Sequence, residues 1–284
     1  MDKYKIYNKD SRYLSKYINK NSIHFIFFSP PYWNLRNYGY ENQIGKYQTY
    51  DQYLKAMRDV FAECYSILKK GRFMAINIGT VVSNEGMKFV VGDFITKAQE
   101  VGFIFRKDII WHKPRGTTKW QRGATQFTQN PYPLFYNTNI NHEFIIIFSK
   151  GEIDNSIRKN EKKFSKIFTR KNAYSVWDII PINSPKKDEK HVAPFPEELP
   201  RRLIQLYTRS NEIVLDPFAG CGTTNKVALE LGRKTIGVEM SNEYCKLIRD
   251  KINKINFKSY NVASVYDDSD DLRVNLIDKE IKDL

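Results

Sequence analysis

An acidic residue, a glycine turn and two threonines follow one another in segment 212–224, EIVLDPFAGCGTT. The residues with potential chemistry in this segment are Asp216, Gly220, Gly222, Thr223 and Thr224. Glycine lets a backbone approach a ligand closely, and a helix that begins at the threonines would offer N–H groups to that ligand. The next apolar run ends in Glu239, where an acid commonly binds ribose hydroxyls. The pattern predicts a site for a nucleoside-containing cofactor, with an ordinary tight turn as the alternative.

A second candidate site is Ser29-Pro30-Pro31-Tyr32, directly after the apolar run 23–28, IHFIFF. Ligands of open α/β sheets bind at the carboxyl ends of strands, which is where this tetrapeptide would lie. Two prolines stiffen the backbone, so the carbonyl groups there stay aimed at one place. Tyr32 adds a flat face on which a ring could stack. Because two prolines also simply end strands, this motif alone leaves both interpretations open.

Both motifs need a scaffold of alternating strands and helices, and the hydrophobic periodicity predicts one. In residues 51–69 the apolar side chains recur at spacings of three and four, which predicts a helix ended by Lys70-Gly71. Further helices are predicted at 88–101, 197–208, 223–231 and 242–256, and strands at 23–28, 73–79, 103–111, 143–148, 212–216 and 234–239. The alternation predicts an α/β fold, a Rossmann-like and mostly parallel sheet with helices on both faces.

Two segments interrupt that alternation. Residues 113–141 have no clear period, and residues 152–192 contain the basic run RKNEKKFSKIFTRK. Long loops inside a compact domain are usually functional or disordered. Basic and aromatic residues are interleaved in both segments, and the chain carries a formal net charge of +14. This charge favours a polyanionic partner, although a general lysine bias would also produce it.

The composition excludes several classes of protein. Cys64, Cys221 and Cys245 form no CxxC pair and the four histidines form no HExxH, so we expect neither a disulfide framework nor a metal site. No apolar run reaches the roughly 18 residues of a membrane span. The first residues, MDKYKIYNKD, lack the apolar core of a signal peptide. We expect a cytoplasmic protein with reduced cysteines and no membrane partner.

Together, SPPY early and DPFAGCGTT late resemble the S-adenosylmethionine-dependent amino-methyltransferases that act on DNA bases. The order of the two motifs is similar to the beta class of that family. The resemblance implies S-adenosylmethionine as cofactor, double-stranded DNA as partner, and a catalytic role for Ser29, Pro30, Pro31 and Tyr32. The implied cofactor-binding residues are Asp10, Asp216, Pro217, Phe218, Ala219, Gly220, Gly222, Thr223, Thr224 and Glu239. Among these, the resemblance places Glu239 on the ribose and Asp10 near the adenine.

Further segments look like parts of the same family. HVAPFPEEL (191–199) is similar to the segment that holds the methionine part of the cofactor. VWDI (176–179) resembles a segment common in cytosine-directed members, and NHEFIIIFSKG looks like a family strand. Arg36 and Tyr38 are candidates for contact with the target base or DNA, with loop packing as the alternative.

The chemistry of amine methylation then assigns roles. The amine lone pair is delocalised into the base and the sulfonium methyl is already activated, so no covalent base adduct is needed. Ser29 and the Pro30 carbonyl can accept the two amino hydrogens, and Tyr32 can stack on a flipped-out base. Carbon-5 methylation of cytosine is disfavoured, because its thiolate usually lies in a Pro-Cys pair and no cysteine here follows a proline.

Two products compete for the target base. In the resembling family, Ser at the first position of the tetrapeptide goes mostly with cytosine and Asp mostly with adenine. A carboxylate beside a flipped cytosine could trap a protonated N3 and withdraw the amine lone pair, so the neutral Ser29 suits cytosine. We expect N4-methylcytosine, with N6-methyladenine as the rival. More distant alternatives are an RNA or protein methyltransferase and a non-catalytic DNA-binding protein on a degenerate methyltransferase fold.

The expected organisation has four parts. A catalytic half with SPPY spans 1–151, a candidate target-recognition insert 152–192, the cofactor-binding half of the same domain 193–257, and a C-terminal tail 258–284. Site-specific methylation of this kind belongs to restriction–modification systems, so a cognate restriction endonuclease is a candidate partner. Monomer and homodimer both remain open.

Overall fold

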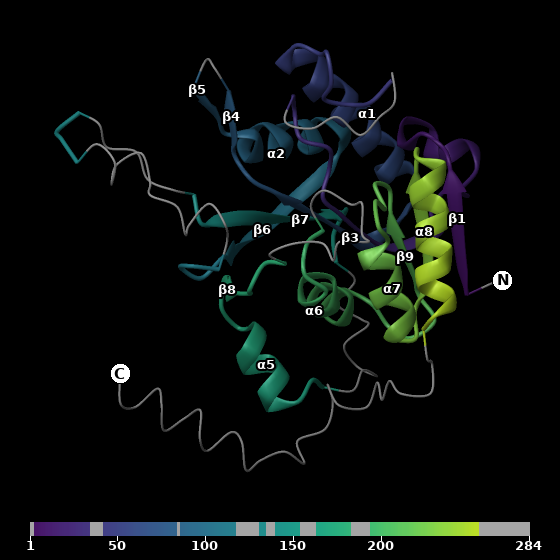
Figure 1. The fold of residues 1–284 in the computed structure, drawn as a ribbon. Coiled ribbons are helices and arrows are strands. Elements are labelled where there is room, and N and C mark those ends of the chain that lie inside the picture. Colours follow the sequence, from purple (N-terminus) through teal and green to yellow (C-terminus); the bar gives the residue numbers. More distant parts are fainter. Residues whose placement is uncertain are drawn as a thin grey trace.

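The computed structural model describes residues 3–34, 42–83, 86–117, 131–134, 140–153, 163–182 and 194–255. Its centre is a sheet of order β1-β10-β9-β2-β3-β7-β6-β8, beside a hairpin of β4 and β5 (Figure 1). The strands are β1 (Tyr4–Asn8), β2 (Ile23–Phe28), β3 (Leu68–Ile78), β4 (Val81–Ser83), β5 (Gly86–Lys88), β6 (Phe103–His112), β7 (His142–Lys150), β8 (Val176–Asp178), β9 (Ile213–Asp216) and β10 (Lys234–Glu239).

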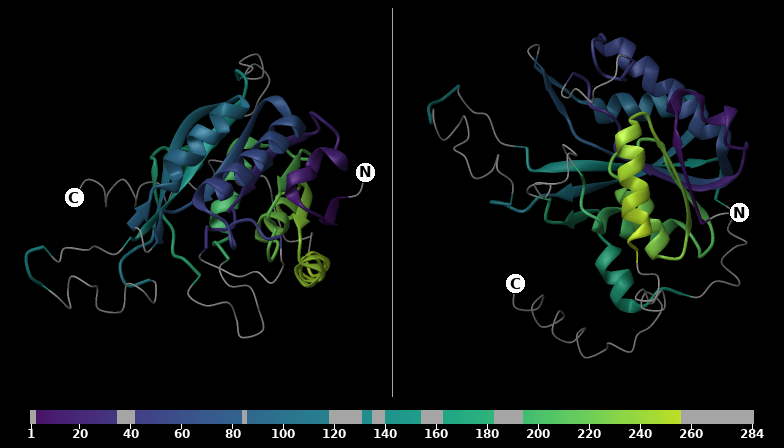
Figure 2. Two further views of the ribbon diagram at one scale, coloured as in Figure 1. Left: turned by 90° about the horizontal axis from the view of Figure 1, so that it is seen from above. Right: turned by 45° about the vertical axis from the view of Figure 1, so that its right-hand side comes forward.

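Helices cover both faces of this sheet, as predicted. They are the 3-10 helix η1 (Ser11–Lys16) and the helices α1 (Tyr50–Ile67), α2 (Val90–Val101), α5 (Lys166–Asn172), α6 (Glu198–Tyr207), α7 (Thr223–Glu230) and α8 (Asn242–Asn253). Helices α1 and α2 lie with η1 on one face, and α6, α7 and α8 lie on the other (Figures 1 and 2). Among the described strands of the large sheet, β7 alone runs antiparallel to the rest. The predicted Rossmann-like, mostly parallel sheet is confirmed.

Strand β2 shows why the sequence is continuously apolar at the centre of the sheet. Ile26 and Phe28 pack into the core beneath α1, whereas Phe25 and Phe27 pack into the core beneath α6. All four side chains are buried, because a central parallel strand is covered on both faces. In the part of the chain that the structure describes, no helix is both long and apolar enough to cross a bilayer.

The predicted end of the first long helix was wrong. Helix α1 stops at Ile67 and β3 begins at once with Leu68, which pairs with Ile23 of β2. Gly71 lies inside β3 with φ +75, where the β2–β3 register shifts. The glycine therefore serves an irregularity of the strand, which permits its positive φ, rather than a helix C-terminus.

Segment 152–192 contains regular elements that the periodicity did not predict. Helix α5 and strand β8 lie in it, and β8 extends the large sheet by pairing with β6. Trp177 anchors β8 with 2% of its surface exposed, and the Trp111 indole N–H donates to the Ile179 carbonyl at 2.8 Å. A strand of three residues with one buried side chain is too short to show a period.

Candidate active site

The two chemical motifs lie side by side at one edge of the sheet. Strands β2 and β9 are parallel neighbours, with Ile26 opposite Leu215, and their carboxyl ends carry the SPPY tetrapeptide and the glycine turn. The chain leaves β9 toward β10 and leaves β2 toward β3, so the strand order reverses between them. Ligands of open α/β sheets bind at such a switch point. The Phe28 and Phe218 rings, with centroids 5.5 Å apart, join the two motifs.

The glycine turn is organised by two acids. Asp216 is buried, and its Oδ1 accepts the Phe218 N–H at 3.0 Å. The carboxylate of Glu239 accepts the backbone N–H groups of Gly220 and Ser241, each at 2.9 Å. Glu239 thus ties the end of β10 to the turn that follows β9.

Asp216 has an unusual electrostatic environment. Burial, reinforced by the negative charge of Glu239, raises the pKa of Asp216 to about 7, although the Phe218 N–H opposes this shift. A buried carboxyl group with such a pKa is partly neutral at physiological pH. A cation bound nearby would favour its ionised form.

The remaining residues of the turn are held tightly. Thr223 and Thr224 are buried, the Ala219 N–H donates to the Val238 carbonyl at 2.9 Å, and the Ser11 hydroxyl donates to the Pro217 carbonyl. The last contact brings the early Lys9-Asp10-Ser11 segment to the late glycine turn. The two segments meet because β1 pairs with β10 at the edge of the sheet.

One glycine of this turn is needed for packing within the protein. Gly222 has φ +78, and a Cβ placed on it would lie 2.9 Å from both γ-carbons of Ile248 on α8. Gly220 also has a positive φ, +50. Gly222 is therefore required because its backbone lies close to helix α8.

The carboxylate of Asp10 is engaged by a residue that the sequence analysis did not single out. The Arg12 guanidinium donates to Asp10 Oδ2 at 2.6 Å and 2.9 Å, and Asp10 raises the pKa of Arg12. Asp10 lies close to the turn, through the neighbouring Ser11, but any ligand of its carboxylate shares it with Arg12.

The SPPY tetrapeptide is braced from two elements. The Tyr53 hydroxyl of α1 donates to the Pro31 carbonyl at 3.0 Å, and the Gly79 N–H after β3 donates to the Tyr32 hydroxyl at 3.2 Å. Pro30 is buried and Ser29 half-buried. Tyr53 has no sequence signal of its own, because its role depends on how α1 packs against the loop.

Next to Tyr32 lies a polar cluster that the sequence analysis missed. Asn77 of β3 donates through Nδ2 to Glu143 Oε2 of β7 at 2.7 Å, and the Lys113 ammonium after β6 donates to Glu143 Oε1. A Cβ on Gly79 would lie 3.2 Å from Glu143 and 3.6 Å from the Tyr32 hydroxyl oxygen. The available signals were the polar Asn77 within an apolar strand and the acid that opens NHEFIIIF.

Among the other segments that the sequence analysis singled out, the structure describes only part. Phe195, from the APFP stretch, packs edge-on against Phe27 with centroids 5.3 Å apart, so this stretch borders β2. Arg36, Tyr38 and His191 fall outside the described residues, as do large parts of 113–141 and 152–192.

In the described part of the chain, the cysteines, acids and histidines form no metal site. All three cysteines are buried and unpaired with one another, and burial raises the pKa of Cys64 and Cys245. Within the described ranges, no group of three or more His, Cys, Asp or Glu residues could hold a metal ion.

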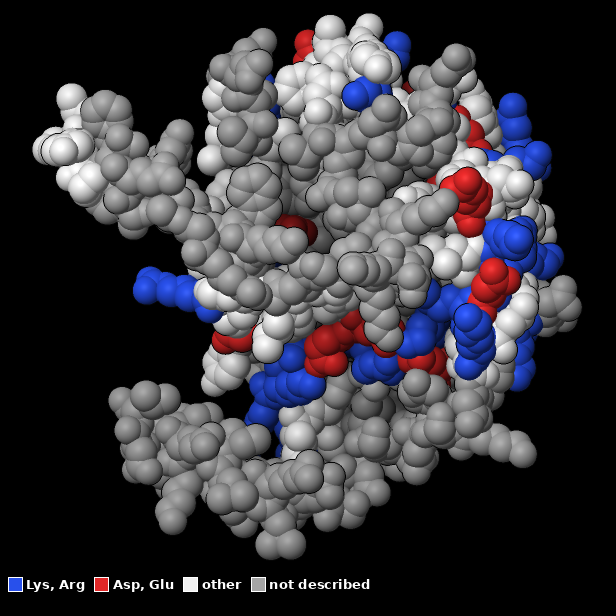
Figure 3. Space-filling view, viewed as in Figure 1, with Lys and Arg blue, Asp and Glu red and all other residues white. Residues whose placement is uncertain are grey.

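Charge on the face seen in Figure 3 is mixed where α6 and α7 lie. Lys226 pairs with Glu197 and Arg201 with Glu230, each at 2.6 Å. Such neutralised pairs produce no one-sign field for a polyanion.

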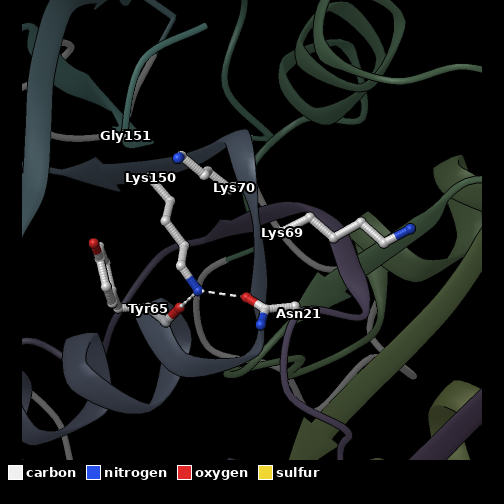
Figure 4. A pocket seen from close by; sticks show the side chains of 6 residues that line it. All are labelled: Asn21, Tyr65, Lys69, Lys70, Lys150 and Gly151. Carbon is white, nitrogen blue, oxygen red and sulfur yellow. Dashed lines mark hydrogen bonds between the residues drawn. The ribbon is translucent and has the colours of Figure 1, made fainter. Parts of the chain in front are cut away.

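A pocket lined by lysines lies at the opposite, amino-terminal edge of β2 and β3 (Figure 4). The Lys150 ammonium donates there to Asn21 Oδ1 at 2.7 Å and to the Tyr65 and Leu68 carbonyls. Lys150 therefore caps the carboxyl end of α1, a structural role far from the two motifs.

Comparison with known proteins identifies the class. The family model N6_N4_Mtase, described as DNA methylase, matches residues 23–250. The chain belongs to this family, and it is an S-adenosylmethionine-dependent DNA methyltransferase.

One sequence relative agrees with this assignment, and two solved structures share the fold. The Type II methyltransferase M.MjaI of Methanocaldococcus jannaschii is 28% identical over 281 residues, which cover 88% of this chain and 91% of the relative. TTHA0409 of Thermus thermophilus, solved in complex with S-adenosyl-L-methionine, has a TM-score of 0.69 at 24% identity and covers 88% of this chain and 93% of its own. PvuII DNA methyltransferase, described as cytosine-N4-specific, has a TM-score of 0.69 at 20% identity, with 94% and 92% covered.

Proposed function

We propose that the enzyme transfers the methyl group to the exocyclic N4 of cytosine in a flipped-out base of double-stranded DNA. The observation that carries the proposal is Ser29, a neutral hydrogen-bond acceptor at the carboxyl end of β2, beside the glycine turn. A neutral group there leaves cytosine N3 unprotonated and the amine lone pair available. N6-methylation of adenine is the competing function, because adenine presents the same amino group.

The cofactor assignment rests on the charges of the turn. S-adenosylmethionine supplies a methyl group on a cationic sulfonium. The buried Asp216 carboxyl, with its pKa near 7, fits a cationic ligand, because the cation would offset the cost of ionising it. Glu239, whose two oxygens already accept backbone N–H groups, is oriented to accept ribose hydroxyls as well. The cofactor-binding set is then completed by Pro217, Phe218, Ala219, Gly220, Gly222, Thr223, Thr224 and Asp10.

The substrate assignments follow from the bracing of SPPY. Tyr53 holds the Pro31 carbonyl, and Gly79 holds the edge of Tyr32, so the Tyr32 ring is fixed as a stacking surface. Ser29 and the Pro30 carbonyl accept the amine hydrogens. This arrangement orients the amine before reaction and lowers the barrier by positioning.

The DNA-facing surface is assigned to segments 113–141 and 152–192. Lys163 and Lys166 are exposed in the second segment, and its α5 and β8 are built onto the sheet edge beyond β6. The likeness to Type II methyltransferases such as M.MjaI supports a place in a restriction–modification system, with a cognate endonuclease as partner.

Mass spectrometry of nucleosides tests the target base. DNA from a methylation-free host is incubated with purified enzyme and S-adenosylmethionine, then digested. N4-methylcytosine is expected, and N6-methyladenine without N4-methylcytosine would refute the cytosine assignment. Tyr32→Phe and Tyr32→Ala form a matched pair of variants: the first keeps the stacking ring and should retain most activity, whereas the second should lose it. Equal transfer to bulk RNA would favour an RNA methyltransferase instead.

A further inference from the structure

The side chain of Asn77 presents an unusual feature in the core of the sheet. Only 1% of Asn77 is exposed, and its Nδ2 is satisfied by Glu143 Oε2 at 2.7 Å. Its Oδ1 is buried and accepts no hydrogen bond from any part of the chain that the structure describes. A buried carbonyl oxygen without a donor costs free energy, so its persistence calls for an explanation, such as a ligand that donates to it.

The position of Asn77 suggests which ligand. Strands β2 and β3 are parallel, with Phe27 opposite Ala75 and Phe28 opposite Ile76, so Ser29 and Asn77 follow as the next pair. Phe27 and Ala75 both pack into the core beneath α6. Because side chains alternate along strands, Ser29 and Asn77 continue on that same face, on strands about 4.8 Å apart.

The orientation of the amide is set by charged groups. Both oxygens of Glu143 act as acceptors, since Oε1 receives the Lys113 ammonium and Oε2 receives the Asn77 Nδ2. Nδ2 of Asn77 is therefore drawn toward β7. The two ends of an amide point apart, so Oδ1 faces away from Glu143 on β7, and β2, which carries Ser29 at its end, is the neighbour of β3 on the other side. Lys113 and Glu143 are both largely shielded, with 19% and 18% of their side chains exposed.

We propose that Asn77 is a catalytic residue whose Oδ1 shares one hydrogen of the target amine with Ser29, while the Pro30 carbonyl accepts the other, and that Glu143 and Lys113 are positioning residues that aim the Asn77 amide. The inference rests on the proposed function, because the amine is taken to lie at Ser29. As reaction proceeds, the amine lone pair forms the new C–N bond, the S–C bond pair stays on sulfur, and one amine proton leaves to water. Positive charge grows on nitrogen meanwhile, and a polarised carbonyl on its N–H stabilises that charge.

The negative charge of Glu143 explains why the Asn77 amide would be a good acceptor. Ser29 is neutral, so SPPY by itself places no negative charge near the developing cation. Glu143 polarises the Asn77 amide through Nδ2, which makes Oδ1 a stronger acceptor without placing a carboxylate directly on the base.

Single-turnover methyl transfer tests the proposal. Full-length enzyme in excess over DNA is mixed with labelled S-adenosylmethionine, and the rate is measured together with the KM for DNA and the Kd for S-adenosylmethionine. Asn77→Ala should lower the single-turnover rate at least tenfold while both binding constants stay within about twofold. Glu143→Gln keeps an acceptor for Nδ2 but removes the charge, so it should lower the rate with little change in Tm.

Asn225→Ala is the matched control. Asn225 is also fully buried, with Nδ2 donating to the Thr235 hydroxyl at 2.8 Å and with an unpartnered Oδ1, but it lies on α7 away from Ser29. This control should lower Tm and leave the single-turnover rate near that of the wild type. Should Asn77→Ala fold poorly, Asn77→Ser keeps a small polar side chain at this position but is too short to reach the amine, and the same loss of rate is expected.

A single-turnover rate of Asn77→Ala or Asn77→Ser within threefold of the wild type overturns the proposal. A loss no larger than that of Asn225→Ala overturns it too, since a structural role alone would explain that result. If the wild-type product is N6-methyladenine, the cytosine assignment fails, whereas the Asn77 role is still judged by these rates, because both bases present the same amine.

Discussion

Gly222→Ala tests whether the glycine is required in the turn after β9 for packing within the protein or for close approach of a ligand. The alanine would have to keep φ +78, and its Cβ would lie 2.9 Å from both Cγ1 and Cγ2 of Ile248. The left-handed conformation costs about 1–2 kcal/mol for a residue with a Cβ. Overpacking of a well-filled core costs about 1–3 kcal/mol. Because both γ-carbons of Ile248 face the new methyl group, a change of the χ1 rotamer removes only one of the two contacts.

We therefore expect Gly222→Ala to lower the free energy of unfolding by about 2–5 kcal/mol. Gly116→Ala is the matched control, because Gly116 has φ +75 but a Cβ there meets nothing within 4 Å. It should lose only the conformational part, about 1–2 kcal/mol. Both values come from urea denaturation of the enzyme without cofactor, so that weaker ligand binding cannot contribute.

A double-mutant cycle with Ile248→Ala identifies the clash directly. That substitution costs about 2–5 kcal/mol alone through its cavity. In the Gly222→Ala background it should cost at least about 1 kcal/mol less, because it removes the two contacting γ-carbons. The packing explanation would be refuted if Gly222→Ala and Gly116→Ala lowered the free energy of unfolding equally, or if the coupling energy were zero. The glycine would then be required for close approach of a ligand instead.

Three further predictions concern ligands. Burial raises the pKa of Asp216 to about 7, so its neutral form dominates below that pH. The affinity for S-adenosylmethionine, measured by calorimetry, should therefore rise with pH up to about 7 and then level off. Asp216→Asn should show no such pH dependence. Glu239→Gln should weaken S-adenosylmethionine binding about tenfold or more, which is about 1.4 kcal/mol, and wild-type affinity in a folded variant would remove the ribose assignment. Neutralising Lys162, Lys163 and Lys166 together should weaken DNA binding. The slope of log K against log salt should fall by about 0.9 for each phosphate that these lysines neutralise. An unchanged slope would mean that the three lysines face away from DNA.

The alternation of strands and helices and the two chemical motifs could be predicted from the sequence, because both are local properties. A period of three to four or a continuous apolar run is visible within a dozen residues, and DPFAGCGTT places its acid, glycines and threonines within one turn. The pairing of SPPY with that turn was inferred through resemblance to a family, and the β2–β9 register brings the two together.

The irregular parts were not predictable in the same way. The end of α1 at Ile67 depends on Leu68 pairing with Ile23 of another strand, and β8 exists as a strand because Trp177 finds a place beside β6. The local sequence pattern predicts neither feature, since each forms only when a distant segment of the chain is already in place.

The candidate site likewise has features that the local sequence determines and features that depend on long-range packing. By itself the sequence determined the residue types and local turn geometry that suit a sulfonium cofactor and an amine substrate. Only the tertiary structure decided that Gly222 faces Ile248, and that Asn77, Lys113 and Glu143 meet beside Gly79 and the Tyr32 hydroxyl. Those three residues come from β3, from the end of β6 and from β7, and strand order and register, which long-range packing selects, bring them to one edge of the sheet.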